Sequence, residues 1–352
     1  MLGLTGFMKA AIFDQFGTSL KIRSVTDLTP HSDGAIIEVH ACGICRSDWH
    51  AWMGHDDEVV LPHVPGHELS GTVIAVGEKV EHWKIGERVT APFCCGCGTC
   101  PECAAGNHHI CDRYTQPGFT QWGAFAEQVE IRFADVNLVR LPNSVDYITA
   151  ASLGCRFATS FRAIVHQGKT KAGHWVAVHG CGGVGLSAVM IAHAIGAMVI
   201  AIDIQPSRLA AAAALGAVET IDALNQPVVA RIREITRRGA DVSIDALGSH
   251  STCWNSIECL GKRGRHVQVG LMLGNQSDPP IPMAAVIAKE LEIYGSHGMQ
   301  AFEYGRLLSM IETGTLQPSK LISDTVSLDQ GAGLLTRMDN FPNTGITVIS
   351  FP

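Results

Sequence analysis

A strand, a glycine-rich turn and a helix constrain the fold of this chain more than any other segment. Val176–His179 is a short, mostly apolar run typical of a buried strand, and Val184–Ile195 has the length and apolar content of a helix. Between them, glycines serve a tight turn, close approach of the backbone to a pyrophosphate, and close packing of helix on strand. A purely structural turn uses glycine in the same way, so the motif alone leaves both interpretations open. The candidate phosphate-binding residues are Gly180, Gly182, Gly183, Val184 and Gly185.

An acidic residue after the next strand favours dinucleotide binding. Met198–Ile202 predicts that strand, and Asp203 follows it about 20 residues beyond the first glycine, where a ribose-binding carboxylate is expected. Such a carboxylate accepts hydrogen bonds from two ribose hydroxyls and repels a 2′-phosphate, so the sequence predicts NAD rather than NADP. Arg208, on the following predicted helix, is a further cofactor-binding candidate. Its positive charge weakens the exclusion of NADP.

Three regions of the 352 residues differ in pattern, which predicts two domains. Residues 1–150 alternate short β-rich runs, such as Ile36–Val39 and Gly71–Val76, with glycine, proline and cysteine turns, as a small antiparallel β domain does. Residues 151–291 alternate strands and helices, which predicts a parallel, doubly wound sheet. Residues 292–352 return to the turn-rich pattern, and we expect them to fold back onto the first domain.

Composition limits the partners and the compartment. The net charge is −7 and no basic run is present, so the chain is a poor candidate for binding nucleic acid. The longest apolar stretch, Ala188–Ile204, is broken by His193 and Gly196 and fits a helix followed by a strand better than a membrane span. The sequence at Met8 resembles a natural start and no secretory signal is evident. We therefore expect residues 1–7 to be an extension and the protein to be cytoplasmic.

Four of the twelve cysteines form a local cluster within residues 94–112. Without a secretion signal, closely spaced cysteines favour metal-bound thiolates over disulfides. The spacing C-x2-C-x2-C-x7-C lets four thiolates close a tetrahedron around one Zn²⁺, and a site with no open position is structural. Cys94 and Cys95 lie at the start of this range, just before the four, and have no assigned role. The predicted ligands are Cys97, Cys100, Cys103 and Cys111.

A second group of cysteine and histidine residues is scattered along the chain. Cys42 and Cys45 lie in one segment, His67 in another, and Cys155 far beyond both. Two thiolates and a neutral imidazole balance the charge of Zn²⁺ and leave a fourth position for water or a substrate oxygen, as a catalytic zinc site requires. Spacing does not decide between Cys42 and Cys45, and the two together are also compatible with a thioredoxin-like redox pair.

Together these residues closely resemble the zinc-containing medium-chain alcohol dehydrogenases, across essentially the whole chain. The resemblance implies an α/β protein, with a GroES-like, mostly β catalytic domain over 1–150 and 292–352 and a Rossmann NAD-binding domain with a doubly wound parallel sheet over 151–291. It also implies NAD and two Zn²⁺ per chain, one catalytic and one structural. The matching pieces are Gly43–Asp48, Gly66–Glu68, the four-cysteine cluster, Cys155, the glycine-rich turn and Asp203.

The resemblance assigns the residues of the catalytic metal site. It makes Cys45, His67 and Cys155 the ligands of the catalytic zinc, with Cys42 a neighbouring core residue. It makes Asp48 and Glu68 carboxylates that orient His67 and tune the ion without binding it directly.

The resemblance also assigns residues around the substrate and the cofactor. Ser47 matches the hydroxyl that hydrogen-bonds the alcohol, and His50 matches the surface histidine that ends a proton relay. Arg46 corresponds to a pyrophosphate contact and Thr159 to a contact beside the nicotinamide. Phe93 corresponds to a wall of the substrate pocket.

The implied activity is reversible hydride transfer between NAD(H) and a primary or secondary alcohol, or the matching aldehyde or ketone. Arg156 departs from the small residue common in relatives and leaves local cofactor contacts unassigned. The lack of the longer insertions of dimeric liver-type enzymes favours a homotetramer over a homodimer. Three alternatives stay open: a polyol or amino-alcohol dehydrogenase, a zinc-free quinone reductase, and a non-enzymatic zinc-binding module.

Overall fold

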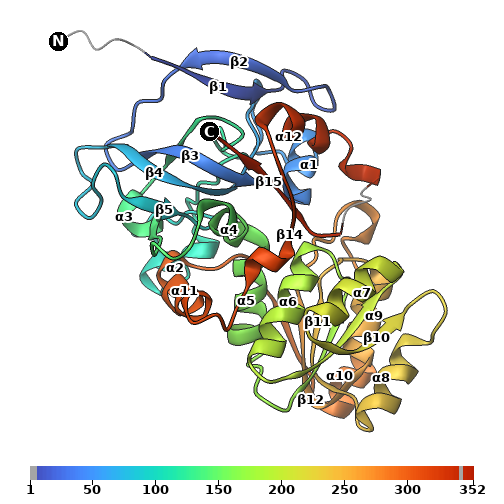
Figure 1. The fold of residues 1–352 in the computed structure, drawn as a ribbon. Coiled ribbons are helices and arrows are strands. Elements are labelled where there is room, and N and C mark those ends of the chain that lie inside the picture. Colours follow the sequence, from blue (N-terminus) through green and yellow to red (C-terminus); the bar gives the residue numbers. More distant parts are fainter. Residues whose placement is uncertain (1–5, 341–343) are drawn as a thin grey trace. The chain divides into compact units, whose positions relative to one another are not determined.

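The computed structural model describes residues 6–340 and 344–352 (Figure 1). The chain divides into two compact units, Met1–Ala158 with Gly298–Pro352, and Thr159–His297. The boundaries expected at about 150 and 291 lie a few residues earlier than these. Beyond the expected first boundary, Gly154 is still tied to the first unit, because its carbonyl accepts a hydrogen bond from the Phe93 N–H at 3.0 Å. Of the expected extension, residues 1–5 lie outside the described residues and Phe7 begins the first strand.

The first unit is built on a mostly antiparallel sheet in the order β14-β15-β3-β4-β5-β7, with β6 also paired to β3, while β1 and β2 form a separate pair. β3 is buried along nearly its whole length, and it pairs with β15, β4 and β6. The predicted return of the C-terminus to this unit is confirmed, since Val348 of β15 pairs with Gly43 of β3. The strands are β1 (Phe7–Ile12), β2 (Lys21–Thr26), β3 (Ala35–Gly43), β4 (Glu68–Val76), β5 (Arg88–Thr90), β6 (Gln128–Ile131), β7 (Val139–Arg140), β14 (Ile322–Val326) and β15 (Ile346–Ser350).

Short helices and turns connect these strands and carry most of the cysteines and histidines of interest. The α-helices are α1 (Arg46–Trp52), α2 (Pro101–Ala104), α3 (Ala134–Asn137), α4 (Tyr147–Ala151), α11 (Tyr304–Glu312) and α12 (Leu328–Leu335). A π-helical turn, Leu153–Phe157, follows α4 and leads into α5 (Ala158–Arg162).

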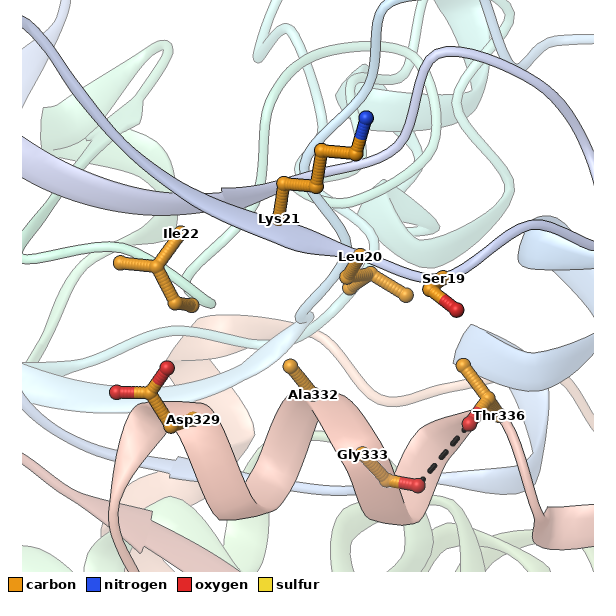
Figure 2. Close-up of a pocket in the computed structure, with 8 residues that line it drawn as sticks. All are labelled: Ser19, Leu20, Lys21, Ile22, Asp329, Ala332, Gly333 and Thr336. Atoms are coloured by element: carbon orange, nitrogen blue, oxygen red, sulfur yellow. Dashed lines mark hydrogen bonds between the residues drawn. The ribbon is translucent and has the colours of Figure 1, made fainter.

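A surface hollow of about 450 Å³ lies between β2 and α12 (Figure 2). Leu20 and Ile22 line one side, and Ala332 and Gly333 the other. Its lining contains no cysteine or histidine, so this hollow is separate from the metal-ligand clusters described below.

The second unit contains a six-stranded, fully parallel sheet in the order β10-β9-β8-β11-β12-β13 (Figure 1). Sequential strands run outward from β8 in one direction and from β11 in the other, which is the doubly wound topology predicted from the sequence. β8 is almost completely buried, as expected for a parallel strand with helices on both faces. The elements are β8 (Trp175–His179), α6 (Gly183–Ala194), β9 (Met198–Asp203), α7 (Pro206–Ala214), β10 (Ala217–Asp222), α8 (Val228–Thr236), β11 (Ala240–Asp245), α9 (His250–Glu258), β12 (Leu260–Gln268), α10 (Met283–Lys289) and β13 (Glu292–Gly295).

The lengths and apolar content of the helices show whether any of them could span a membrane. Among the described residues, no helix is both long enough and apolar enough to cross a bilayer.

Candidate active site and metal centres

Three distant segments of the first unit bring Cys45, His67 and Cys155 together. One sulfur or nitrogen atom from each lies within 4.8 Å of the others. Cys45 is the N-cap of α1, His67 immediately precedes β4, and Cys155 lies in the π-helical turn. Cys45 and His67 are buried and Cys155 is half-buried. π-helical turns occur often at functional sites, and here the turn presents a sulfur to the other two groups.

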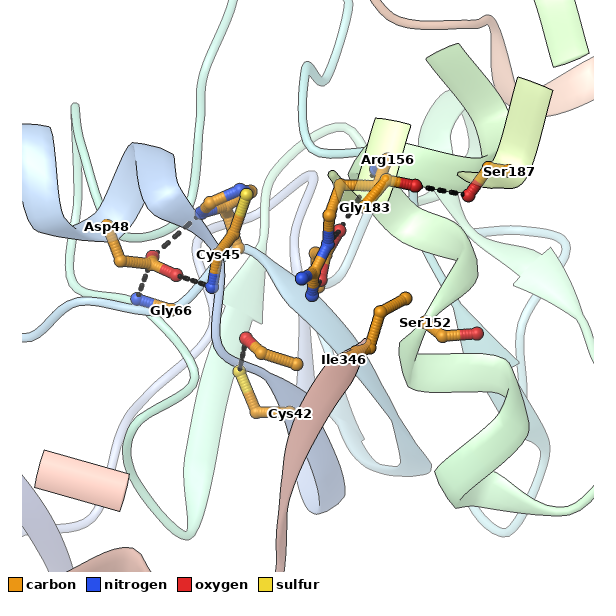
Figure 3. A network of polar contacts seen from close by, with 12 residues as sticks. Cys42, Cys45, Asp48, Gly66, Ser152, Arg156, Gly183, Ser187 and Ile346 are labelled. Atoms are coloured by element: carbon orange, nitrogen blue, oxygen red, sulfur yellow. Dashed lines mark hydrogen bonds and ion pairs between the residues drawn. The ribbon is translucent and has the colours of Figure 1, made fainter. Parts of the chain in front are cut away.

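Asp48 fixes the orientation of His67 and the start of α1. The Asp48 carboxylate accepts hydrogen bonds from His67 Nδ1 at 2.7 Å and from the Gly66 N–H at 3.0 Å. It also accepts one from the Cys45 N–H at 2.9 Å, at the first turn of the helix (Figure 3). Because a carboxylate only accepts, Nδ1 carries a ring proton, which leaves Nε2 as the ring nitrogen that could bind a metal.

The unpaired Nε2 of His67 tests whether a metal ion fits between these groups. This atom is buried and has no nitrogen or oxygen hydrogen-bond partner among the described residues, and the side chain that interacts with it is Cys45. A buried acceptor left without a partner costs about 1–3 kcal/mol. A Zn²⁺ held by Nε2 and the sulfurs of Cys45 and Cys155 would satisfy that atom, and a donor set of two cysteine sulfurs and one imidazole suits zinc.

Burial and hydrogen bonding distinguish Cys45 from Cys42. Cys42 is fully buried and its thiol donates to the carbonyl of Gly43 at 3.6 Å (Figure 3). Burial raises the pKa of the Cys42 thiol well above its ordinary value. A hydrogen bond from Cys155 holds the pKa of Cys45 well below its ordinary value, and the positive charge of Arg156 adds to that effect. Of the two cysteines, Cys45 is the one suited to be a thiolate.

Two aromatic rings pack against His67. The ring of Phe93 stands edge-on to His67, with 6.1 Å between ring centroids. Phe119, which sequence reasoning missed because it lies in an irregular turn with no recognisable motif, also stands edge-on to His67 at 5.4 Å. Ser47 and His50 both lie on α1 and are half-buried.

The four-cysteine cluster forms within a single loop and the short helix α2. The four sulfurs lie within 4.8 Å of one another, and all four residues are buried. Backbone N–H groups point at them: Cys97 N–H lies 3.3 Å from Cys111 Sγ, and Cys103 N–H lies 3.4 Å from Cys100 Sγ. Such donors favour thiolates over thiols. Cys94 and Cys95 are buried outside this cluster.

The glycine-rich turn in the second unit has the shape expected at a phosphate site. Gly180 has φ +88°, and a Cβ on Gly185 would lie 1.8 Å from the Gly180 carbonyl oxygen, so helix and turn pack as closely as the motif predicts. A Cβ on Gly182 would meet nothing within 4 Å, and no side chain caps the first turn of α6. The N–H groups of that turn remain available to an anion.

Asp203 and Thr159 are the other predicted cofactor residues in this unit. The Asp203 carboxylate, at the end of β9, accepts a hydrogen bond from the Cys181 N–H at 2.7 Å and lies 4.0 Å from Arg208. Asp203 therefore also ties the glycine-rich turn to the neighbouring strand. The hydroxyl of Thr159 is buried with no hydrogen-bond partner among the described residues.

Comparison with known proteins identifies the family. Residues 31–143 match the alcohol dehydrogenase GroES-like domain, and residues 183–313 match the zinc-binding dehydrogenase domain. The chain belongs to the zinc-containing alcohol dehydrogenase family. This result confirms the predicted combination of a GroES-like domain with a Rossmann domain.

Relatives of the chain within this family include enzymes of more than one name. An alcohol dehydrogenase of Geobacillus stearothermophilus is 30% identical, over 90% of this chain and 94% of its own length. A sorbitol dehydrogenase of Bacillus subtilis is 30% identical, over 98% and 97%. The solved structure of the alcohol dehydrogenase TADH from Thermus sp. ATN1 is 31% identical and has a TM-score of 0.89, covering 97% of this chain and 99% of that one.

The hydrogen-bond partner of Glu68 is a residue other than His67. Its carboxylate instead pairs with Arg156, whose backbone N–H and Nε both donate to Oε1 at 3.0 Å and whose Nη2 donates to Oε2. Glu68 is fully buried and Arg156 is 7% exposed. Because Glu68 follows His67 and Arg156 follows Cys155, this ion pair joins the segments that carry two of the three ligand atoms. Arg156, which is larger than the residue common at this position in relatives, is therefore held by Glu68, a partner that the sequence did not predict.

Arg46 has neighbours of its own in the first unit. Its guanidinium lies over the ring of Trp49, 4.1 Å from the centroid, and donates to the carbonyl of Met338. Its assignment as a pyrophosphate contact stays a prediction.

Proposed function

We propose that this protein catalyses the reversible, NAD-linked oxidation of primary or secondary alcohols, with Cys45, His67 and Cys155 holding a catalytic zinc. The observation that carries the proposal is the buried, unpaired Nε2 of His67 beside two cysteine sulfurs. When bound, zinc supplies a Lewis acid for the substrate oxygen and NAD supplies the hydride acceptor.

The chain's own residues orient the reactants and move the proton. Asp48 holds His67 in the tautomer that leaves Nε2 free, through a hydrogen bond that is completely buried. Ser47 takes the alcohol proton in the oxidation direction, and His50 receives it farther out along α1. Phe93 and Phe119 exclude water beside His67, which strengthens the electrostatic effect of the charged groups there.

A second, structural zinc belongs to the proposal. Four buried sulfurs with N–H donors aimed at them support a closed site with no position for substrate. The expected stoichiometry is two zinc ions per chain.

NAD is the proposed cofactor of the second unit. The N–H groups at the start of α6 would hold its pyrophosphate and Asp203 its adenosine ribose, with Arg208 nearby. The unpaired hydroxyl of Thr159 supports a polar contact on the nicotinamide side, and Arg46 is the proposed pyrophosphate contact from α1.

We also propose a cytoplasmic homotetramer, with a homodimer as the alternative assembly. The outermost strand β13 offers an unpaired edge that favours self-association. Exposed apolar side chains nearby in the sequence support the same interpretation, and they include Leu271, Met283 and Ile287. None of the twelve cysteines, all of which lie among the described residues, forms a disulfide, as is usual in a reducing compartment. Light scattering during gel filtration measures the assembly, and a monomer would contradict it.

Substrate class is the main alternative within this function. The sorbitol dehydrogenase relative favours a polyol dehydrogenase as the second candidate. A screen of NAD⁺ reduction over primary, secondary, benzylic and polyol alcohols, with zinc-loaded protein, separates the two. NADH formation with a simple alcohol supports the proposal, and turnover of polyols alone replaces it with the second candidate. No NADH with any alcohol would leave a zinc-binding module without this chemistry.

A further inference from the structure

The turn after α1 returns the chain alongside the helix's own last residues. Gly54 has φ +77°, and a Cβ there would lie 2.9 Å from the ring of Phe16, so both backbone and packing require glycine. The N–H of His55 donates to the carbonyl of His50 at 3.0 Å. The backbone alone therefore places His55 beside His50.

The side chains of the two histidines meet directly. His50 Nδ1 and His55 Nδ1 are 3.0 Å apart, which requires one of them to donate a proton to the other. Both rings also stand edge-on to Trp49, at 5.0 and 5.7 Å between centroids. Trp49 in turn lies under the guanidinium of Arg46. The pair is thus held by backbone, ring packing and a shared hydrogen bond.

We propose that His55 is the outermost station of the proton path, receiving from His50 and releasing to solvent. This inference rests on the proposed function, in which Ser47 and His50 carry the alcohol proton outward. In oxidation, a proton enters His50 at Nε2 while the Nδ1 proton passes to His55 Nδ1. His55 then loses its Nε2 proton to water or buffer. Each ring gains one N–H bond and loses another, so charge and protons balance, and exchange with solvent restores the starting tautomers.

The surroundings of His50 disfavour its protonated form. Burial, the charge of Arg46 and the neighbouring His55 together lower the pKa of His50 to about 4, against a weaker opposite effect of Cys45. A protonated His50 is therefore short-lived at neutral pH. His55 is exposed, so solvent water reaches its ring and can accept a proton from it.

The test compares four variants with the wild-type holoenzyme: His55→Gln, His50→Ala, the double variant, and His82→Gln as a control at an exposed histidine elsewhere. Glutamine keeps a polar side chain but does not shuttle a proton. We expect His55→Gln to lower kcat for alcohol oxidation about 5-fold near neutral pH. This is less than the loss of a general base usually causes, because water partly replaces the missing imidazole. Added imidazole buffer should restore the rate. The double variant should be no slower than His50→Ala, because the two groups act in series.

The outcomes separate this inference from the proposed function. An active wild type whose His55→Gln variant keeps the same pH–rate profile and shows no response to imidazole overturns the inference alone. A double variant slower than His50→Ala by the full factor of His55→Gln would also overturn it, since the groups would then act independently. A wild type that forms no NADH from any alcohol overturns the proposed function and the relay with it.

Discussion

The two metal-ligand clusters of the first unit are built in opposite ways. The four-cysteine cluster takes all its sulfurs from residues 97–111, and backbone N–H groups of the same loop point at them. The other cluster takes Cys45, His67 and Cys155 from three segments, and buried charges surround it. The first is a closed set of four cysteine sulfurs. In the proposed function, the second would leave one coordination position without a protein ligand, as a catalytic zinc site requires.

This difference predicts which property each cluster controls. Few apolar side chains pack against the four-cysteine loop, so a metal ion bound there would mainly stabilise the folded state. A site assembled from the start of a helix, the start of a strand and a π-helical turn depends on the surrounding fold for its geometry. Substitutions at the two clusters should therefore separate folding from chemistry.

The largest effect is expected at Cys45, compared with its neighbour Cys42. Cys45→Ala removes a proposed ligand and should lower kcat by more than the roughly 100-fold that changes beside a metal site usually cause, with loss of one zinc per chain. Cys42→Ala, the matched control, should keep both metals and most activity because its thiol is a buried core group. Metal analysis and steady-state kinetics check both. Zinc loss in Cys42→Ala but not in Cys45→Ala would reverse the assignment.

Cys100→Ala should act on stability. Three thiolates remain, so we expect Tm to fall on the order of 10 °C, while protein that stays folded keeps kcat within a few-fold of the wild type. Calorimetry and kinetics at low temperature measure the two properties separately. Cys95→Ala is the control, because Cys95 is a buried cysteine outside the cluster. An unchanged Tm in Cys100→Ala would mean that the loop holds no closed zinc site.

The ion pair between Glu68 and Arg156 should link stability to the catalytic cluster. Arg156→Met leaves a buried carboxylate without its partner and should cost about 3–5 kcal/mol of unfolding free energy. It should also speed the release of one zinc to a chelator. The double variant Arg156→Met/Glu68→Gln removes both charges and should regain most of the loss. If the single and double variants are equally stable in denaturant titrations, the pairing does not hold the site.

The smallest expected effect is on coenzyme choice in the second unit. Asp203→Gly removes the ribose hydrogen bonds and the charge that repels a 2′-phosphate, so kcat/KM for NADP relative to NAD should rise about 10-fold or more. Asp203 also accepts from the Cys181 N–H, so Asp203→Asn, which keeps an acceptor oxygen, controls for loosening of the turn. An unchanged preference in both variants would show that another group selects the coenzyme.

The sequence predicted the elements whose signals are local. The strand expected at Val176–His179 is Trp175–His179, and the helix expected at Val184–Ile195 is Gly183–Ala194. These succeed because apolar runs and a glycine-rich turn lie next to one another in the chain. The four-cysteine cluster was readable for the same reason.

Contacts between distant segments were beyond the sequence. Spacing left Cys42 and Cys45 unresolved, since only the fold shows which thiol faces His67. The hydrogen-bond partner of Glu68 was also beyond the sequence, because Arg156 lies 88 residues away in the chain. No sequence motif predicts the contact of Phe119 with His67, and none predicts the contact of His50 with His55.

Zinc removal followed in time tests the central claim most directly. A chelator is added to the purified protein while released zinc, alcohol oxidation with NAD⁺ and circular dichroism are recorded together. Two zinc ions per chain should leave in two phases, because one site is open and the other closed. Activity should vanish with the first phase and the folded signal should fall only with the second. A single zinc per chain, or activity that persists until the slower metal leaves, would contradict the assignment of Cys45, His67 and Cys155 as the catalytic centre.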